Sequence, residues 1–188
     1  HLELTNTDNI SEELSNKLSR SKLYKNDIVF PCVGTIGHAA VILENEKYHI
    51  NQNIAKITPA KILYPLFLTF FLMSDFTIKQ IFKYNASTSQ PNVLVGNLRK
   101  FLILIPSLSE QQKIASILSN VDNLIDSYEK TIESTKKLKK GLMQTLLTKG
   151  IGHKEFKKIS LEPKFVNTKI PKKWDLLELK NLLQQKIS

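Results

Sequence analysis

The clearest hydrophobic pattern lies in the second half of the chain, where apolar side chains recur every three or four residues through residues 109–152. No proline interrupts this stretch, and Gly150 and Gly152 lie at its end. Ser109 stands three residues before Gln112, which is the spacing of a capping box at a helix start. The pattern predicts one continuous helix of about 40 residues, roughly 60 Å long.

A helix of this length needs a partner for its apolar stripe. The stripe follows a seven-residue repeat, as in a coiled coil, so we expect it to pack against a second long helix from another part of the protein or from a second copy of the chain. The alternative is an ordinary amphipathic helix that folds back on its own domain. The expected seam residues are Ile114, Ile117, Val121, Leu124, Tyr128, Leu138 and Leu142.

The first 108 residues predict a mixed α/β domain, so that the whole chain belongs to the α+β class. Short apolar runs bounded by turn residues indicate strands, and one longer apolar run indicates a buried helix. The polar residues 5–21 show little pattern. The strands are expected at residues 27–33, 39–43, 48–57 and 101–105, the helix at residues 64–82, and a polar loop at residues 85–92.

Residues 153–188 predict a basic linker followed by the start of another domain. Nine lysines stand against four acidic residues there, and the apolar-periodic residues 176–183 follow. The expected regions are therefore 1–108, 109–152 and 153–188.

Charge and cysteine content narrow the class of protein. The formal net charge is +10, which indicates an anionic partner. The single cysteine, Cys32, excludes an internal disulfide and has apolar neighbours that predict a buried thiol. These features favour a cytoplasmic protein. The most apolar run, residues 62–73, is too short to cross a bilayer, so we expect no membrane association. Because the chain begins at His1 without methionine, we interpret it as part of a longer protein.

No constellation of residues indicates catalysis. The sequence lacks the Asn- or Asp-Pro-Pro-aromatic motif with which amino-methyltransferases hold the target base. Gly34 and Gly37 are too close together for a phosphate-binding loop and predict a turn instead. Asp175, Glu178 and Lys180 superficially match a metal-dependent nuclease, but their surroundings indicate an amphipathic helix rather than a strand that would present them.

Metal chemistry is also not expected on this chain. His38, His49 and His153 are too dispersed for a ligand set. We therefore expect no catalytic residue, no metal and no bound cofactor.

Polar loops beside basic residues are the candidates for DNA contacts. Amide and hydroxyl side chains can distinguish base edges, whereas Lys and Arg attract phosphate regardless of sequence. The alternative for each amide is that it caps a strand or fixes a turn. The expected base contacts are Thr35, His38, Asn51, Gln52, Asn53, Ser87, Ser89, Gln90 and Asn92, and the expected phosphate contacts are Lys17, Arg20 and Lys22.

Five short motifs resemble the specificity subunits of type I restriction–modification systems. Residues 108–115 resemble the "PPLxEQxxIA" start of the family's conserved helix, and residues 142–150 resemble its end. Residues 26–37 resemble the "GDI…GTIG" pattern of a recognition domain, and residues 51–53 and 89–92 also fit that pattern. Residues 170–174 resemble the "IPxxW" that opens a second recognition domain. The chain departs from the pattern at Ser107, usually proline, and at Asn26, usually glycine.

The resemblance implies a function and a set of partners. Each of two recognition domains in this family reads half of a split target in double-stranded DNA, and two long helices separate the domains. Methyltransferase subunits modify adenine with S-adenosylmethionine, and a motor-nuclease subunit that uses ATP and Mg²⁺ cleaves unmodified DNA. The chain resembles the later part of the first domain, the helix and the start of the second domain.

Two other classes of function stay open at the level of sequence. The chain is compatible with a coiled-coil adaptor that binds no DNA, and salt dependence separates the two because DNA binding weakens steeply with salt. An enzyme is the third possibility, and incubating the chain with DNA, Mg²⁺ and S-adenosylmethionine tests it.

Overall fold

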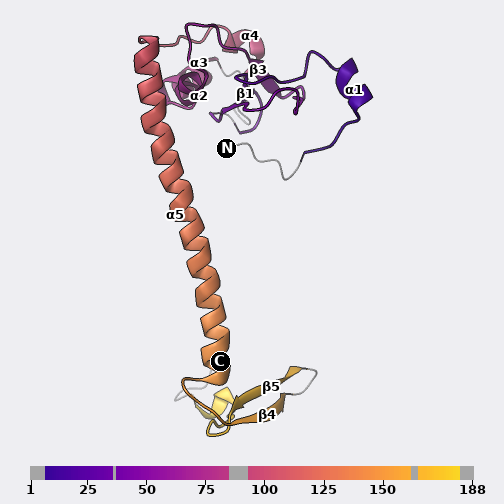
Figure 1. Ribbon diagram of the computed structural model, residues 1–188, viewed down its shortest axis with the longest axis vertical. Helices are drawn as coiled ribbons and strands as arrows, with labels where there is room; N and C mark the ends of the chain where they lie inside the picture. Colours follow the sequence, from indigo (N-terminus) through magenta and orange to yellow (C-terminus); the bar gives the residue numbers. More distant parts are fainter. Residues whose placement is uncertain (1–6, 36, 85–92, 162–164, 183–188) are drawn as a thin grey trace. The chain divides into compact units, whose positions relative to one another are not determined.

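A computed structural model describes residues 7–35, 37–84, 93–161 and 165–182 (Figure 1). It divides into two units, residues 1–123 and residues 124–188, and the long helix α5 contributes to both. Helices and two small sheets confirm the predicted α+β class. The predicted boundaries at residues 108 and 152 stay predictions.

Three short antiparallel strands form the sheet of the first unit. The central strand β1 (Ile28–Pro31) pairs on one side with β2 (Ala40–Val41) and on the other with β3 (Ile54–Ile57). All three predicted strands are present, but β3 is much shorter than the predicted residues 48–57. Residues 48–50 instead run beside residues 21–23, where Leu23 N donates to Tyr48 O and Ile50 N donates to Ser21 O.

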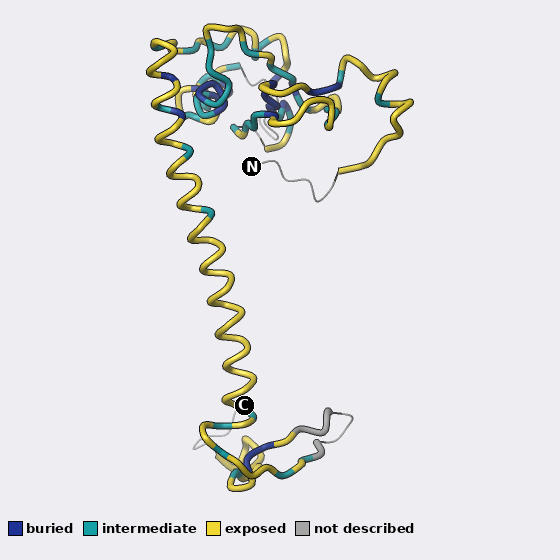
Figure 2. The backbone as a smooth tube through the Cα atoms, viewed as in Figure 1, coloured by how far each residue is buried: buried dark blue, intermediate teal, exposed yellow. Residues whose placement is uncertain are grey.

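The core lies on both faces of β1. Ile28 and Phe30 are fully buried against Leu68 and Leu72 of the helical layer. Val29 points the other way and packs with a second cluster that contains Leu23 and Ile42. Successive strand residues face opposite sides, so a strand with three consecutive buried residues must be covered on both. Figure 2 shows most of the buried positions in this unit.

The helix predicted at residues 64–82 is two helices, α2 (Pro65–Leu72) and α3 (Asp75–Tyr84), bent by 60°. Ser74 accounts for the break. Its hydroxyl donates to Phe71 O over 2.6 Å and faces Thr77 N at 3.4 Å, so it serves the end of one helix and the start of the next. The hydroxyl of Thr77 also donates to Phe71 O, at 2.7 Å.

Two further short helices complete the first unit. The helix α1 (Glu12–Lys17) lies within the stretch for which the sequence showed little pattern, and α4 (Val95–Leu98) precedes the long helix.

Among the described residues, no single helix has the length and apolar composition to cross a membrane. The helices α2 and α3 meet that test only as a bent pair, and their residues Leu68, Leu72 and Ile81 belong to the core.

The strand predicted at residues 101–105 is wrong. This segment has no strand partner, although its residues are as apolar as expected. The side-chain amide of Gln80 takes the place of a neighbouring strand: Leu102 N donates to Gln80 Oε1 over 2.7 Å, and Gln80 Nε2 donates to Leu102 O over 3.0 Å. One side chain thus satisfies both backbone groups of Leu102, which the sequence pattern does not reveal.

Asn26 stands where the resembled pattern has glycine, and its backbone conformation is one that glycine adopts readily. Its φ is +73°, in the left-handed region that asparagine tolerates better than most residues. The next residue, Asp27, is buried, and its carboxylate accepts bonds from Tyr24 N at 2.9 Å and from the Thr58 hydroxyl at 2.6 Å. These bonds close a turn that leads directly into β1.

The long helix α5 runs from Leu108 to Lys149, close to the predicted residues 109–152. The expected cap at Ser109 is wrong, because Ser107 is the residue that caps: its hydroxyl accepts from Glu110 N at 3.3 Å and its carbonyl accepts from Gln111 N at 2.9 Å. At the other end, Gly150 has a φ of +66° and its N–H donates to Leu146 O.

The buried side chain of Gln111 ties the start of α5 to the start of α2. Its Oε1 accepts from Tyr64 N at 2.7 Å, and its Nε2 donates to Ile62 O at 3.0 Å and to Pro106 O at 2.9 Å. Gln111 is fully buried, as is Ala115 one turn later. The glutamine of the family motif therefore satisfies three backbone groups inside the protein.

The second unit contains a β-hairpin where the sequence predicted a linker. The strands β4 (Phe156–Leu161) and β5 (Phe165–Pro171) pair antiparallel. Lysine-rich composition concealed these strands, since lysine is depleted in strands generally. The apolar-periodic stretch that follows contains one short 3₁₀ turn, η1 (Leu179–Asn181).

The base of the hairpin packs on the end of α5. A Cβ atom on Gly150 would lie 2.6 Å from His153 Cδ2 and 2.8 Å from Trp174 Cζ2, so only glycine fits beneath these rings. The two rings meet edge to face with centroids 5.9 Å apart. This contact joins the two motifs that the sequence places at residues 142–150 and 170–174.

Replacing Gln111 with alanine is expected to lower the free energy of unfolding by about 1–3 kcal/mol, because buried backbone groups lose their partners. Urea denaturation followed by circular dichroism measures the change. Gln112→Ala is the matched control: Gln112 is exposed, and the change should stay within about 0.5 kcal/mol. Equal stabilities of the two variants would show that the Gln111 bonds do not hold the helix start.

Candidate functional site

Cys32 lies directly after β1, and its backbone contacts residues next to two of the predicted base-contacting loops. Its N–H donates to Asn53 O over 2.7 Å, and its carbonyl accepts from Val93 N over 2.9 Å. The loop with Thr35 and His38 follows Cys32 in the chain, Asn53 ends the second loop, and Val93 follows the third. The backbone of Cys32 therefore holds the end of the second loop at Asn53 and the residue that follows the third, Val93.

The first loop carries exposed candidates. Thr35 and His38 are both exposed, and Gly34 and Gly37 have positive φ values of +83° and +87°. These glycines turn the chain back toward β2, which confirms the turn predicted from their spacing. The two side chains are free to contact a ligand from this loop.

In the second loop one side chain fixes the turn by a hydrogen bond. Asn51, Gln52 and Asn53 are all exposed. The side-chain oxygen of Asn51 accepts from Asn53 N at 3.0 Å, which is the turn-fixing role that we kept as the alternative. Asn53 contributes its backbone carbonyl to Cys32, whereas Gln52 sits at the tip of the turn with its side chain in solvent.

The third loop lies outside the described residues. The predicted contacts Ser87, Ser89, Gln90 and Asn92 fall there and stay predictions. The residues that flank the loop are placed: the amide of Asn97 donates to Tyr84 O at 3.3 Å, and Val93 is fully buried beside Cys32.

The three predicted phosphate contacts differ in what they are free to do. Lys17 is exposed but pairs with Glu13 at 2.6 Å, and Arg20 is exposed. Lys22 is buried, with its ammonium 3.3 Å from Glu46 and 3.4 Å from the Asn16 amide oxygen. The charge of Lys22 is thus engaged within the domain, and its phosphate contact stays a prediction.

His49 attaches the segment with α1 to the rest of the unit. Its ring nitrogens lie 2.8 Å from the Ser15 hydroxyl and 2.9 Å from the Ser21 hydroxyl. Ser21 donates its proton to Leu18 O, so it accepts from His49 Nδ1. Lys17 ends α1, a helix that has no buried residue of its own, and Arg20 lies in the turn that follows, just before Ser21.

The Cys32 side chain is structural. It is buried as predicted, and burial raises the pKa of the thiol, while a backbone hydrogen bond from Ala55 acts in the opposite direction. The neutral thiol is the stable form, which is a poor nucleophile.

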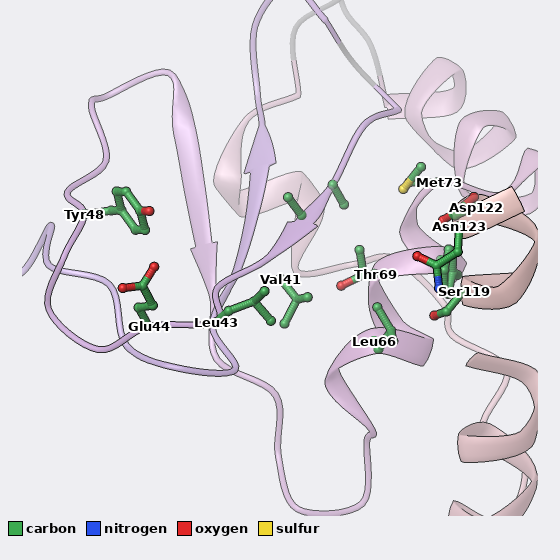
Figure 3. Close-up of a pocket in the computed structure, with 13 residues that line it drawn as sticks. Val41, Leu43, Glu44, Tyr48, Leu66, Thr69, Met73, Ser119, Asp122 and Asn123 are labelled. Carbon is green, nitrogen blue, oxygen red and sulfur yellow. The ribbon is translucent and has the colours of Figure 1, made fainter. Parts of the chain in front are cut away.

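A hollow of about 410 Å³ lies on another side of the first unit, between β2, α2 and α5 (Figure 3). Val41, Leu43 and Leu66 form an apolar wall, and Ser119, Asp122 and Asn123 of α5 face it. The lining includes no His, Cys or Lys, and the lining Glu44 is paired with Lys47. The lining thus lacks histidine, the side chain that general acid–base catalysis uses most often.

Metal ligands are similarly sparse in the described part of the chain, where no group of three His, Cys, Asp or Glu residues could hold an ion. The nuclease-like residues of the sequence include Glu178 and Lys180, which form an ion pair with each other.

The predicted seam of α5 is solvent-exposed in the single chain, except that Ile114 is half-buried. From Ser127 to Leu147 every helical residue is exposed (Figure 2). The partner helix stays a prediction. The exposed seam residues are Ile117, Val121, Leu124, Tyr128, Leu138 and Leu142.

Sequence reasoning missed the role of Cys32 as the junction of the loops. Its contribution comes from backbone N–H and C=O groups, which carry no residue signature. The only available signal was its position between the strand and the glycine turn.

Comparisons with known proteins identify similar sequences along most of the chain. The family described as "Type I restriction modification DNA specificity domain" matches residues 2–137. The putative type I restriction enzyme MjaX specificity subunit of Methanocaldococcus jannaschii is 31% identical over 187 residues, which cover 96% of this chain and 43% of that protein. The MjaVIII specificity subunit of the same organism is 33% identical over 163 residues, covering 85% and 36%.

Two more relatives extend the comparison. The type I restriction enzyme EcoBI specificity subunit of Escherichia coli is 28% identical over 149 residues, covering 79% of this chain and 31% of that protein. The crystal structure of the HsdS subunit from Thermoanaerobacter tengcongensis superposes with a TM-score of 0.52 at 21% identity, covering 67% of this chain and 33% of that one. The chain thus spans less than half the length of each of these relatives.

Replacing Asn51 with alanine is expected to lower the free energy of unfolding by about 0.5–1.5 kcal/mol, because Asn53 N loses its acceptor. Asn51→Asp keeps an acceptor oxygen at the same place and should retain stability within about 0.5 kcal/mol. Chemical denaturation of both variants measures the difference. An alanine variant as stable as the wild type would reopen a purely ligand-contacting role for Asn51.

Proposed function

Because the chain belongs to the type I restriction–modification DNA specificity family, we propose that it reads part of the DNA target for such a system. In this proposal the chain performs no catalytic step. It directs adenine methylation and restriction by partner subunits, which bring S-adenosylmethionine, ATP and Mg²⁺. Such a protein acts on cellular DNA and therefore works in the cytoplasm.

The observation that carries the proposal is that the backbone of Cys32 holds both Asn53 and Val93, while Cys32 itself leads into the loop with Thr35 and His38. Reading a base pair requires donors and acceptors held in fixed positions on a rigid support. The backbone bonds from Cys32 to Asn53 and Val93 fix the loops against a strand that is buried on both faces. Backbone bonds of this kind do not depend on which side chains stand at the loop tips.

The geometry favours different roles for the polar residues of these loops. Thr35, His38 and Gln52 are exposed and are proposed to contact base edges. Asn51 is proposed to shape the turn, with Asn53 supplying its carbonyl. Ser87, Ser89, Gln90 and Asn92 keep their predicted roles as base contacts.

Phosphate contacts are proposed for Lys17 and Arg20, which are exposed. The ammonium of Lys22 pairs with Glu46, so a phosphate contact by Lys22 would require this pair to open or to be shared. Contacts of this kind position the protein on the duplex without reading sequence.

The exposed seam of α5 supports a second candidate, in which the helix recruits a partner and the domain binds no DNA. The two candidates differ in one measurable property: binding of duplex DNA that weakens steeply with salt. Within the preferred proposal the seam packs against another long helix of the same protein, and the methyltransferase subunits assemble around it.

Gln52→Ala is expected to reduce binding to the cognate half-site by about 1–3 kcal/mol with little change on random duplex, since a base-reading amide is lost. The measurement is a titration of labelled duplexes with the full-length protein and its methyltransferase. Arg20→Ala is the matched contrast and should weaken both duplexes while lowering the salt slope by about one unit. Equal losses on both duplexes for Gln52→Ala, with unchanged stability, would remove Gln52 from the readout.

Val121→Asp combined with Leu124→Asp is expected to abolish self-association of this chain, because each buried carboxylate would cost several kcal/mol in a packed seam. Sedimentation velocity measures the oligomeric state. Ser134→Asp with Gln144→Asp adds the same charge at exposed positions outside the seam and should leave association intact. A wild-type chain that is monomeric with its helix fully formed would contradict the seam prediction.

A further inference from the structure

The β4–β5 hairpin presents two lysines directly opposite each other. Lys158 and Lys169 are register partners, so their side chains stand on the same face of the hairpin. Both are exposed. Cβ atoms at such positions are about 4.5–5.5 Å apart, and like charges at this separation repel.

No acid in the described part of the chain neutralises this pair. Lys172, at the base of the hairpin, pairs with Glu155 at 3.2 Å, but Lys158 and Lys169 form no ion pair with any described residue. Glu155 is also the single acid among residues 153–161 and 165–173. The lysines of these two ranges are Lys154, Lys157, Lys158, Lys169, Lys172 and Lys173.

The hairpin holds these charges on an ordered support. Ile170, next to Lys169, is buried, and so is Pro171. Lys172 N donates to Glu155 O over 3.0 Å, and the rings of His153 and Trp174 pack on Gly150 at the end of α5. A repulsive pair on a fixed strand surface is stabilised when an anion lies between or beside the two ammonium groups.

We propose that this hairpin binds the phosphate backbone of duplex DNA through Lys158 and Lys169. The inference rests on the proposed function and adds to it a contact site in the second unit, separate from the loops around Cys32. Duplex DNA is favoured over an acidic protein because protein interfaces are depleted in lysine, whereas lysine-rich surfaces are typical of nucleic-acid contact. The contact is independent of sequence.

The test uses the whole chain and a fluorescein-labelled duplex of random sequence, titrated from 50 to 200 mM KCl. Lys158→Gln with Lys169→Gln is expected to weaken binding on the order of tenfold at 0.1 M salt and to lower the slope of log K against log salt by about two units. Lys130→Gln with Lys136→Gln removes the same charge from exposed positions on α5 and should change both quantities less. Circular dichroism checks that the variants are folded.

Protection of lysines from acetylation gives a second readout. Acetylation of Lys158 and Lys169 should slow when the duplex is bound, and mass spectrometry measures it residue by residue. A wild-type chain that binds no duplex even at 50 mM KCl would contradict the proposed function itself. Wild-type binding that is unchanged in Lys158→Gln with Lys169→Gln, or lowered equally in the α5 control, would overturn the hairpin site alone.

Discussion

The two-sided burial of β1 is the constraint on which the first unit depends. A strand of four residues cannot be stable alone, and this one is held because Ile28 and Phe30 pack against the helices while Val29 packs against Leu23 and Ile42. Once β1 is fixed, the residue that follows it is fixed as well. Cys32 then sets the position of two other chain segments through one N–H and one C=O. A small hydrophobic core thus governs where polar loop residues stand.

Two glutamine side chains hold segments that lie outside the helices and strands. Gln80 supplies Leu102 with both hydrogen bonds of a missing strand, and Gln111 serves Tyr64, Ile62 and Pro106 from inside the protein. A side-chain amide has a donor and an acceptor side by side, so it can replace a peptide group of a neighbouring strand. The segment between α4 and α5 is therefore ordered without being part of a sheet.

The sequence correctly predicted the features that a hydrophobic pattern or a short motif marks. The family resemblance, the long helix, β1 and the buried Cys32 are confirmed. Tertiary hydrogen bonds decided the failures: Ser74 breaks the helix predicted at residues 64–82, and Gln80 replaces the expected strand at residues 101–105. At the site, exposure of Thr35, His38 and Gln52 agrees with their chemistry, but the engagement of Lys22 with Glu46 depends on residues 24 positions apart and has no local signal.

The packing of Trp174 and His153 on Gly150 bears on how such chains can be recombined. The end of the long helix contacts the segment after it where the rings of His153 and Trp174 pack against Gly150, which has no side chain. A chimera with a crossover between residues 153 and 173 inherits the glycine from one parent and the tryptophan from the other. Such a chimera keeps this packing only if the parents share the glycine and the tryptophan and their two hairpin strands pair in the same register.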